Sequence, residues 1–162
     1  MIVNDTLTVM LGHNTLYLHI CKIYLRTLKE DKMKILVGYD GSKVADDVIQ
    51  LARKHAKAFG AEVHIMTSLE QGAALKKEDI DKAESKLEKL KTSLKVDEIA
   101  CEVLTSVSYE SPGEDLVRFA KENQVDEIII GVRRRSKVGK LVFGSTAQYV
   151  ILEAPCPVVA VK

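Results

Sequence analysis

Short runs of apolar residues alternate along the chain with longer stretches in which apolar residues recur every three or four positions. The runs are typical of buried strands, and the longer stretches are typical of amphipathic helices. Strands are predicted at 34–37, 62–67, 99–107, 126–130 and 158–161, with a helix between each pair. The alternation indicates one α/β domain with parallel strands, right-handed helical crossovers and helices on both faces of the sheet.

Two of these helices carry recognisable boundary signals. Ser42 is predicted to be the N-cap of the first helix, which is predicted to end at Gly60 because glycine favours the left-handed cap conformation. Ser111 and Glu114 have the spacing of a capping box, with Pro112 at the first helical position. These signals indicate where the loops at the strand ends meet the helices.

Residues 1–32 do not share this pattern. The stretch 7–28 is moderately apolar, but polar and charged residues interrupt it, so it is too polar for a membrane span of ~20 apolar residues. It also lacks the basic start and small-residue cleavage site of a signal peptide. Met33 begins the well-patterned segment, and we interpret 1–32 as an extension from an upstream start or an added arm, outside the domain 33–162. An arm that packs on a partner subunit is the alternative.

The composition is that of a soluble globular protein, with 46% hydrophobic and 29% charged residues among 162. The net charge of +1 provides no overall field toward nucleic acid or membrane, so neither is expected as a partner. The three widely spaced cysteines indicate free thiols in a reducing compartment, and the expected location is the cytoplasm. The four histidines show no metal-ligand spacing.

The loop that begins at Gly131 is the most distinctive stretch of the chain. It joins an apolar strand to the start of a helix at Gly144, Ser145 and Thr146, where free N–H groups and the helix dipole favour an anion. A loop of this length in such a connection usually has a function. We predict phosphate binding, with a solvated basic surface as the alternative. The loop carries five cationic side chains: Arg133, Arg134, Arg135, Lys137 and Lys140.

A second polar loop, 38–42, follows the first strand. In open α/β sheets, ligands bind beyond the carboxyl ends of the strands, where the strand order reverses. If strands one and four are neighbours, Asp40 faces the basic loop across a crevice and can accept hydrogen bonds from a ribose or a base. Ser42, Ser145 and backbone N–H groups can then hold phosphates. The alternative for Asp40 is a simple turn residue, because Asp-Gly is a common turn pair.

Residues 33–162 resemble the universal stress protein family over essentially their whole length. The resemblance implies a Rossmann-like, adenine nucleotide alpha hydrolase-like fold with a five-stranded parallel sheet in the order 3-2-1-4-5. It also implies homodimers joined through Val158–Val161, and adenine and ribose contacts from Asp40 and from the backbone near Met66 and Thr67. The features that carry it are Ile35-Leu-Val-Gly-Tyr-Asp40, the loop Gly131 to Gly144-Ser145, and Ala154-Pro-Cys-Pro-Val-Val-Ala-Val161.

ATP-binding members of that family carry glycine, two residues, glycine, nine residues, glycine, and then Ser or Thr. The chain matches at Gly131, Gly144 and Ser145, but Arg134 stands at the second glycine. Arg134 either blocks the triphosphate, which leaves a non-binding or AMP-like site, or turns outward or clamps a phosphate, which keeps ATP. The nucleotide-binding residues expected are Asp40, Ser42, Met66, Thr67, Gly131, Arg133, Arg134, Gly144, Ser145 and Thr146.

We therefore predict a dimeric module that binds ATP or AMP, with Mg²⁺ accompanying the nucleotide, and that acts in the stress response through an unidentified protein partner. One alternative is a slow ATPase or phosphoryl transferase. It is less favoured because Asp40 is the only acidic residue placed in the crevice and no catalytic set can be assembled. The other is a protein-interaction module that uses the 131–145 loop. The lack of aromatic residues in the basic stretch argues against a nucleic-acid groove.

Overall fold

The computed structural model describes residues 32–132 and 143–162. The predicted N-terminal extension, apart from Lys32, and the basic side chains of 133–140 lie outside these residues. Within the described part of the chain, no helix is long and apolar enough to cross a membrane. No group of three or more potential metal-binding side chains is found in that same part.

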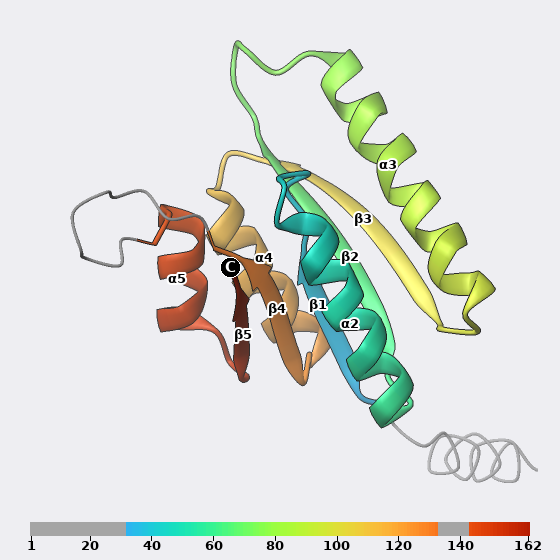
Figure 1. Cartoon of the computed structure of the whole chain (residues 1–162). Helices are drawn as coiled ribbons and strands as arrows, with labels where there is room; N and C mark the ends of the chain where they lie inside the picture. The colour runs from blue at the N-terminus through green and yellow to red at the C-terminus, as the bar shows by residue number, and fades with distance from the viewer. Residues whose placement is uncertain (1–31, 133–142) are drawn as a thin grey trace, which may run out of the picture. The chain divides into compact units, whose positions relative to one another are not determined.

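A five-stranded parallel sheet forms the centre of the domain (Figure 1). Its strand order is β3-β2-β1-β4-β5, which confirms the predicted fold. The apolar runs at 34–38 and 127–131 form strands because helices cover both faces there and bury side chains on either side of the strand, whereas the two edge strands are at most half-buried. The strands are β1 (Lys34–Gly38), β2 (Glu62–Glu70), β3 (Cys101–Ser108), β4 (Glu127–Gly131) and β5 (Val158–Val161).

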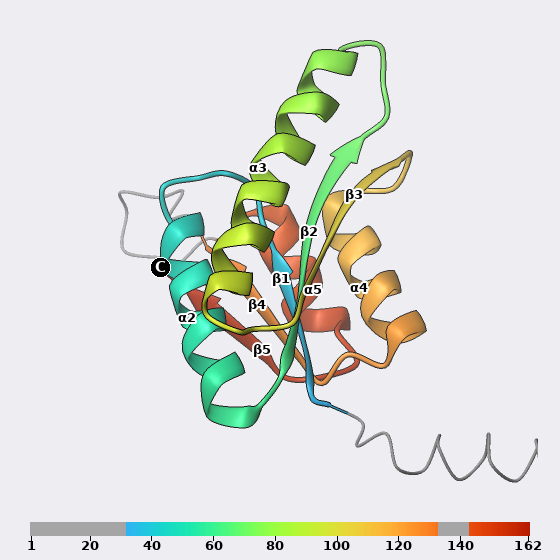
Figure 2. The same cartoon turned by 90° about the vertical axis from the view of Figure 1, so that its right-hand side faces the viewer.

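Helices cover both faces of this sheet (Figures 1 and 2). Alternate residues of one strand therefore belong to different cores. In β1, Ile35 and Val37 pack in the core under α2 and α3, whereas Leu36 packs in the core under α4 and α5. The described helices are α2 (Ala45–Phe59), α3 (Lys77–Val96), α4 (Pro112–Asn123) and α5 (Ser145–Glu153).

The second strand is longer than predicted, and this difference shapes the region above the sheet. β1 ends at Gly38, whose partner in β2 is Met66. β2 continues to Glu70 because its last residues pair with β3 instead, with Ser68 opposite Ser106. Ser68 therefore lies beyond the end of β1, where the neighbouring strand no longer fills the space beside it.

Two of the three predicted helix boundaries are confirmed. Gly60 has the left-handed conformation with φ 64°, and the Ser111 hydroxyl accepts the Glu114 N–H while the Glu114 carboxylate accepts the Ser111 N–H. The prediction that Ser42 caps the first helix is wrong, because α2 begins three residues later with Val44 as its N-cap. The Ser42 N–H is instead bound by the Asp40 carboxylate, which closes a turn before the helix.

Candidate functional site

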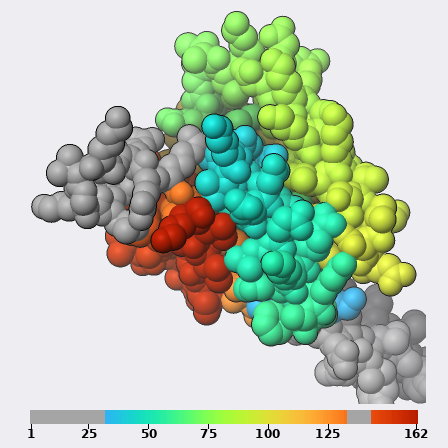
Figure 3. Space-filling model, in the orientation of Figure 1, coloured from blue at the N-terminus to red at the C-terminus, as the bar shows by residue number. Residues whose placement is uncertain are grey.

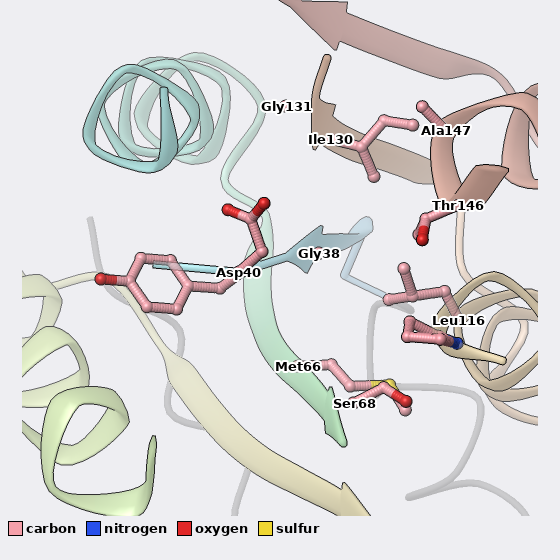
Figure 4. A pocket seen from close by; sticks show the side chains of 11 residues that line it. Gly38, Asp40, Met66, Ser68, Leu116, Ile130, Gly131, Thr146 and Ala147 are labelled. Atoms are coloured by element: carbon pink, nitrogen blue, oxygen red, sulfur yellow. The ribbon is translucent and has the colours of Figure 1, made fainter. Parts of the chain in front are cut away.

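A cavity of about 160 Å³ opens beyond the carboxyl ends of β1, β2 and β4 (Figure 4). It lies where the strand order reverses, since β2 pairs with one edge of β1 and β4 pairs with the other. This is the place at which open α/β sheets bind ligands. The lining residues are Gly38, Tyr39, Asp40, Met66, Ser68, Pro112, Leu116, Ile130, Gly131, Thr146 and Ala147.

The walls of the cavity are apolar and carry only a few polar groups. Met66, Leu116 and Ile130 are each less than 5% exposed and come from β2, α4 and β4. The polar side chains of Asp40, Ser68 and Thr146 come from three different elements (Figure 4). Apolar walls with a small number of placed polar groups are typical of small-molecule sites.

Gly38 gives the cavity its depth at the end of β1. A Cβ at this position would lie 3.0 Å from the Ile130 Cγ2 and 3.0 Å from the Leu116 Cδ1, which is too close for either side chain to stay in place. Gly131 differs, because its Cβ would point toward Val44 and Val48 at ordinary contact distances, on the other face of the sheet. Gly131 therefore contributes its backbone to the cavity, whereas Gly38 contributes space.

The turn after β1 holds the Asp40 carboxylate in a defined position. Its Oδ1 accepts the Ser42 N–H at 2.9 Å, and Gly41 adopts φ 65°, which glycine tolerates without strain. The backbone before it is fixed as well, since the Tyr39 N–H donates to the Met66 carbonyl at 2.9 Å. Burial raises the pKa of the Tyr39 phenol, and the nearby carboxylates of Asp46 and Asp40 raise it further. The phenol is thus a neutral neighbour of Asp40.

Across the cavity from this turn, α5 begins with backbone N–H groups that lack a side-chain cap among the described residues. Gly144 is the N-cap, and Thr146 and Ala147 in the first turn line the cavity. α4 begins differently, since the Ser111 hydroxyl accepts an N–H of its first turn. An open helix N-terminus with its positive dipole end at a cavity is suited to an anion such as phosphate.

Beside Ser68, the cavity is bordered by a buried polar network centred on Asp115. Asp115 lies in the first turn of α4 with a side chain that is 0% exposed. Its Oδ2 accepts the Ser68 hydroxyl at 2.5 Å, and its Oδ1 accepts the Ser108 hydroxyl at 2.9 Å and an Arg118 N–H at 2.6 Å. Arg118 also pairs with Glu110 at 2.7 Å. The network links the ends of β2 and β3 to α4.

The structure brings four of the predicted site residues together around the cavity: Asp40, Met66, Gly131 and Thr146. Four others do not line it: Ser42, Thr67, Gly144 and Ser145. Thr67 lies on the opposite face of β2, where its hydroxyl donates to the Tyr39 carbonyl at 2.9 Å. Arg133 and Arg134 lie outside the described residues, so their prediction stays untested.

The predicted site did not include Ser68 or the residues of α4, and Gly38 was predicted only as the start of the loop 38–42. For Ser68 a signal was available, because it is two residues after Met66 and residues at that spacing point to the same face of a strand. Asp115 has no such signal. An acidic residue in the first turn of a helix usually indicates a favourable dipole contact at the surface, and the burial of this one is visible only in the folded chain.

Comparison with known proteins shows the family to which residues 33–162 correspond. Residues 33–162 match the model of the universal stress protein family. A universal stress protein of Methanocaldococcus jannaschii is 31% identical and covers 80% of this chain and 81% of its own length. The structure of a universal stress protein from Archaeoglobus fulgidus has a TM-score of 0.72 at 37% identity, covering 80% of this chain and 98% of that one. Another from the same organism, in complex with dAMP, has a TM-score of 0.68 at 32% identity over the same shares.

Proposed function

The chain belongs to the universal stress protein family, and on the geometry of its cavity we propose that it is a regulatory module that binds an adenine nucleotide. The observation that carries the proposal is the placement of Asp40 and the start of α5 on two sides of one apolar cavity. A nucleotide has a flat apolar base, a ribose with hydroxyl donors and an anionic phosphate end. The cavity has a chemically suitable group to contact each of these three parts.

In this arrangement the base enters between the apolar side chains of Met66, Leu116 and Ile130. The Asp40 carboxylate accepts hydrogen bonds from the ribose hydroxyls, and the open N–H groups at the start of α5 bind phosphate. The relative solved with dAMP supports a nucleotide ligand, because it shares 32% of its sequence and covers 80% of this chain. We propose ATP or AMP as the ligand, with Mg²⁺ accompanying the triphosphate.

Binding is proposed ahead of catalysis because phosphoryl transfer requires a group that orients the nucleophile as well as a metal. Among the described residues, Asp40 is the one acidic side chain that lines the cavity. We propose that the bound nucleotide changes the backbone of residues 131–145 and thereby the choice of a protein partner in the stress response. Hydrogen exchange with and without ATP tests this, and equal protection of residues 131–145 in both states would count against it.

Calorimetric titration with ATP and AMP, with and without Mg²⁺, tests nucleotide binding itself. Gly144→Val is the informative variant, because no atom of the described residues lies within 4 Å of its added Cβ and its φ of −65° suits any residue. The fold should therefore survive while the branched side chain keeps phosphate from the helix start. We expect a loss of affinity of at least about tenfold, which corresponds to ~1.4 kcal/mol.

Gly72→Val is the matched control, because it also has no atom within 4 Å of an added Cβ and lies away from the cavity. It should bind nucleotide like the original chain. Failure of the original chain to bind either nucleotide would refute the proposal. Equal affinity of the two variants would refute the assignment of phosphate to the start of α5.

We also propose a homodimer through β5, the last strand in the sheet order. Atoms of the C-terminal end of the chain, in the deepest red, lie at the surface seen in Figure 3. The Ile128 N–H donates to the Pro157 carbonyl and the Val132 N–H donates to the Val161 carbonyl, so the odd-numbered residues face β4. The backbone of Val158 and Ala160 therefore faces the outer edge. Such an edge favours pairing with another strand, and the same strand of a second copy fits the apolar sequence.

Substitution of Ala160 tests this dimer without disturbing the β4 ladder. Ala160→Pro removes an N–H from the outer edge only, whereas Ala160→Gly keeps it. Sedimentation equilibrium should find the original chain and Ala160→Gly dimeric and Ala160→Pro monomeric. A monomeric original chain, or an unaffected Ala160→Pro dimer, would contradict the proposal.

A further inference from the structure

We propose that the Ser68 hydroxyl, oriented by the buried Asp115 carboxylate, makes the cavity prefer a base with an exocyclic amino group over one with a keto oxygen at the same position. The inference rests on the proposed nucleotide function and names the residue pair that sets base specificity. Ser68 is the residue that contacts the base, and Asp115 is a positioning residue that acts through it.

The first step is the direction of the Ser68 proton. A hydroxyl has one O–H donor and two acceptor lone pairs, and an ionised carboxylate only accepts. Since the Ser68 Oγ lies 2.5 Å from the Asp115 Oδ2, its proton is used in that bond. Ser68 lines the cavity, so the groups it has left for a ligand are lone pairs. The cavity therefore presents an acceptor at this point.

The second step is that this orientation is held firmly. Asp115 is fully buried, and its other bonds come from donors as well, the Ser108 hydroxyl and the Arg118 guanidinium. The Arg118 guanidinium can only donate, and it contacts the Asp115 Oδ1 at 2.6 Å. Ser68 has no second donor, and turning its proton toward the cavity would leave two acceptors facing each other at 2.5 Å. A reversal of this kind removes the shorter bond of the buried Oδ2, which keeps only the Ser108 hydroxyl at 3.0 Å, and losing a bond to a buried carboxylate costs more than a normal bond gains.

The third step is that the base, rather than the phosphate, meets Ser68. The negative charge of Asp115 directly behind Ser68 disfavours an anion at this end of the cavity. The start of α5 offers the opposite electrostatic environment. Met66 is two residues before Ser68 on the same face of β2 and provides the apolar surface on which a base can stack. The edge of a base placed there faces the Ser68 lone pairs.

The chemical consequence is a discrimination between amino and keto bases. The amino group of adenine donates to Ser68, whereas the keto oxygen of hypoxanthine is an acceptor and would face another acceptor. Sites built around a fixed hydrogen bond reject the analogue that cannot make it. The Thr146 hydroxyl also lines the cavity, but no hydrogen-bond partner among residues 32–132 and 143–162 orients it, and it can serve either as donor or as acceptor. Ser68 is therefore the group that distinguishes the two bases.

Calorimetric titration with AMP and IMP tests the inference, because the two differ in this group and keep the same ribose and phosphate. We expect the original chain to bind AMP about ten- to a hundredfold more tightly than IMP, as for one mismatched hydrogen bond. Ser68→Ala should reduce this ratio to within about threefold, mainly through weaker AMP binding, because the acceptor is gone.

Asp115→Asn tests whether Asp115 sets base specificity, because a purely structural role would not change the ratio of AMP affinity to IMP affinity. Because Arg118 donates to Oδ1, the amide oxygen should occupy that site and the amide nitrogen should face Ser68. The amide then donates to Ser68, whose proton becomes available to the cavity. IMP should gain affinity relative to AMP, beyond the ratio found for Ser68→Ala. Asp47→Asn, an exposed first-turn residue of α2, should leave the AMP to IMP ratio unchanged.

The possible outcomes separate the two proposals. If AMP and IMP bind the original chain equally well, or if Ser68→Ala keeps the full discrimination, the Ser68 inference is wrong while nucleotide binding stands. If neither nucleotide binds, the proposed function fails and this inference fails with it. Thermal melting of each variant shows whether it is folded, and Ser68→Ala alone decides the matter if Asp115→Asn does not fold.

Discussion

Removing the Asp115 carboxylate should destabilise the fold far more than removing an ordinary acidic residue from the first turn of a helix. Asp115 is 0% exposed and accepts bonds from Ser68, Ser108 and Arg118. In Asp115→Ala the hydroxyls of the two half-buried serines lose their acceptor. Hydrogen bonds to a charged group contribute ~1.5–3 kcal/mol each, and part of this is offset because the variant no longer buries a charge.

Arg118 adds little to this cost. Its side chain is 45% exposed and still pairs with Glu110, so it returns to water when its buried partner is removed. We therefore expect Asp115→Ala to lower the free energy of unfolding by about 2–4 kcal/mol, below the sum of its bonds. Asp47→Ala is the matched control, since it removes an exposed carboxylate from the first turn of α2 and should cost only about 0.5 kcal/mol.

Urea unfolding followed by circular dichroism measures both variants against the original chain. The comparison is valid if the dependence of the unfolding free energy on urea is the same for all three proteins. A loss for Asp115→Ala within about 0.5 kcal/mol of that for Asp47→Ala would refute the reasoning, because it would mean that the buried network contributes no more than a helix dipole contact.

Three further predictions follow from single residues. Hydrogen bonds from Ser111 lower the pKa of Glu114 below 4.5, so the stability they contribute is present above that pH and lost as the pH falls through the lowered value. The difference in urea midpoint between the original chain and Glu114→Gln should therefore shrink from neutral pH to about pH 3. A constant difference would contradict this. Burial raises the pKa of Cys101 to about 11, so iodoacetamide near pH 8 should label this thiol much more slowly in the folded than in the urea-unfolded chain. Peptide mass mapping follows the labelling, and equal rates in the two states would contradict the prediction. Gly38→Ala places a Cβ 3.0 Å from the Leu116 side chain. It should weaken AMP binding in calorimetry and lower the free energy of unfolding by at most about 2 kcal/mol. Unchanged affinity would show that the added methyl group does not reach the ligand.

Features that depend on a few neighbouring residues were predictable from the sequence. The apolar runs in β1 and β4 form buried strands because their composition suits no other environment. Gly60 and the Ser111 capping box were identified correctly because both act through bonds that span three to five residues. The strand order came from family resemblance, since the apolar pattern alone does not say which strands are neighbours.

The site itself was predicted only in part. Asp40, Gly131 and Thr146 follow strands or begin a helix, and the rules that ligands bind at strand ends and anions at helix starts were enough to select them, whereas Met66 came from the family resemblance. Ser42 was wrongly expected to cap a helix. Its N–H is bound by the Asp40 carboxylate in a turn before the helix, and α2 begins three residues later with Val44 as its N-cap. Thr67 was predicted to contribute its backbone; its side chain points to the face opposite Met66 and binds the Tyr39 carbonyl, so the prediction for its backbone stays untested.

What the sequence by itself determined is therefore the set of strands and helices, most of their local boundaries and the end of the sheet at which the cavity lies. Only the tertiary structure decided that β2 continues past β1, that α4 covers this extension, and that Asp115 is consequently buried against Ser68. The physical reason is the separation along the chain of the residues that interact. Helix caps and apolar periodicity act between residues close in the chain, whereas the Ser68–Asp115 bond joins residues 47 positions apart and exists only after the sheet and the helix have packed together.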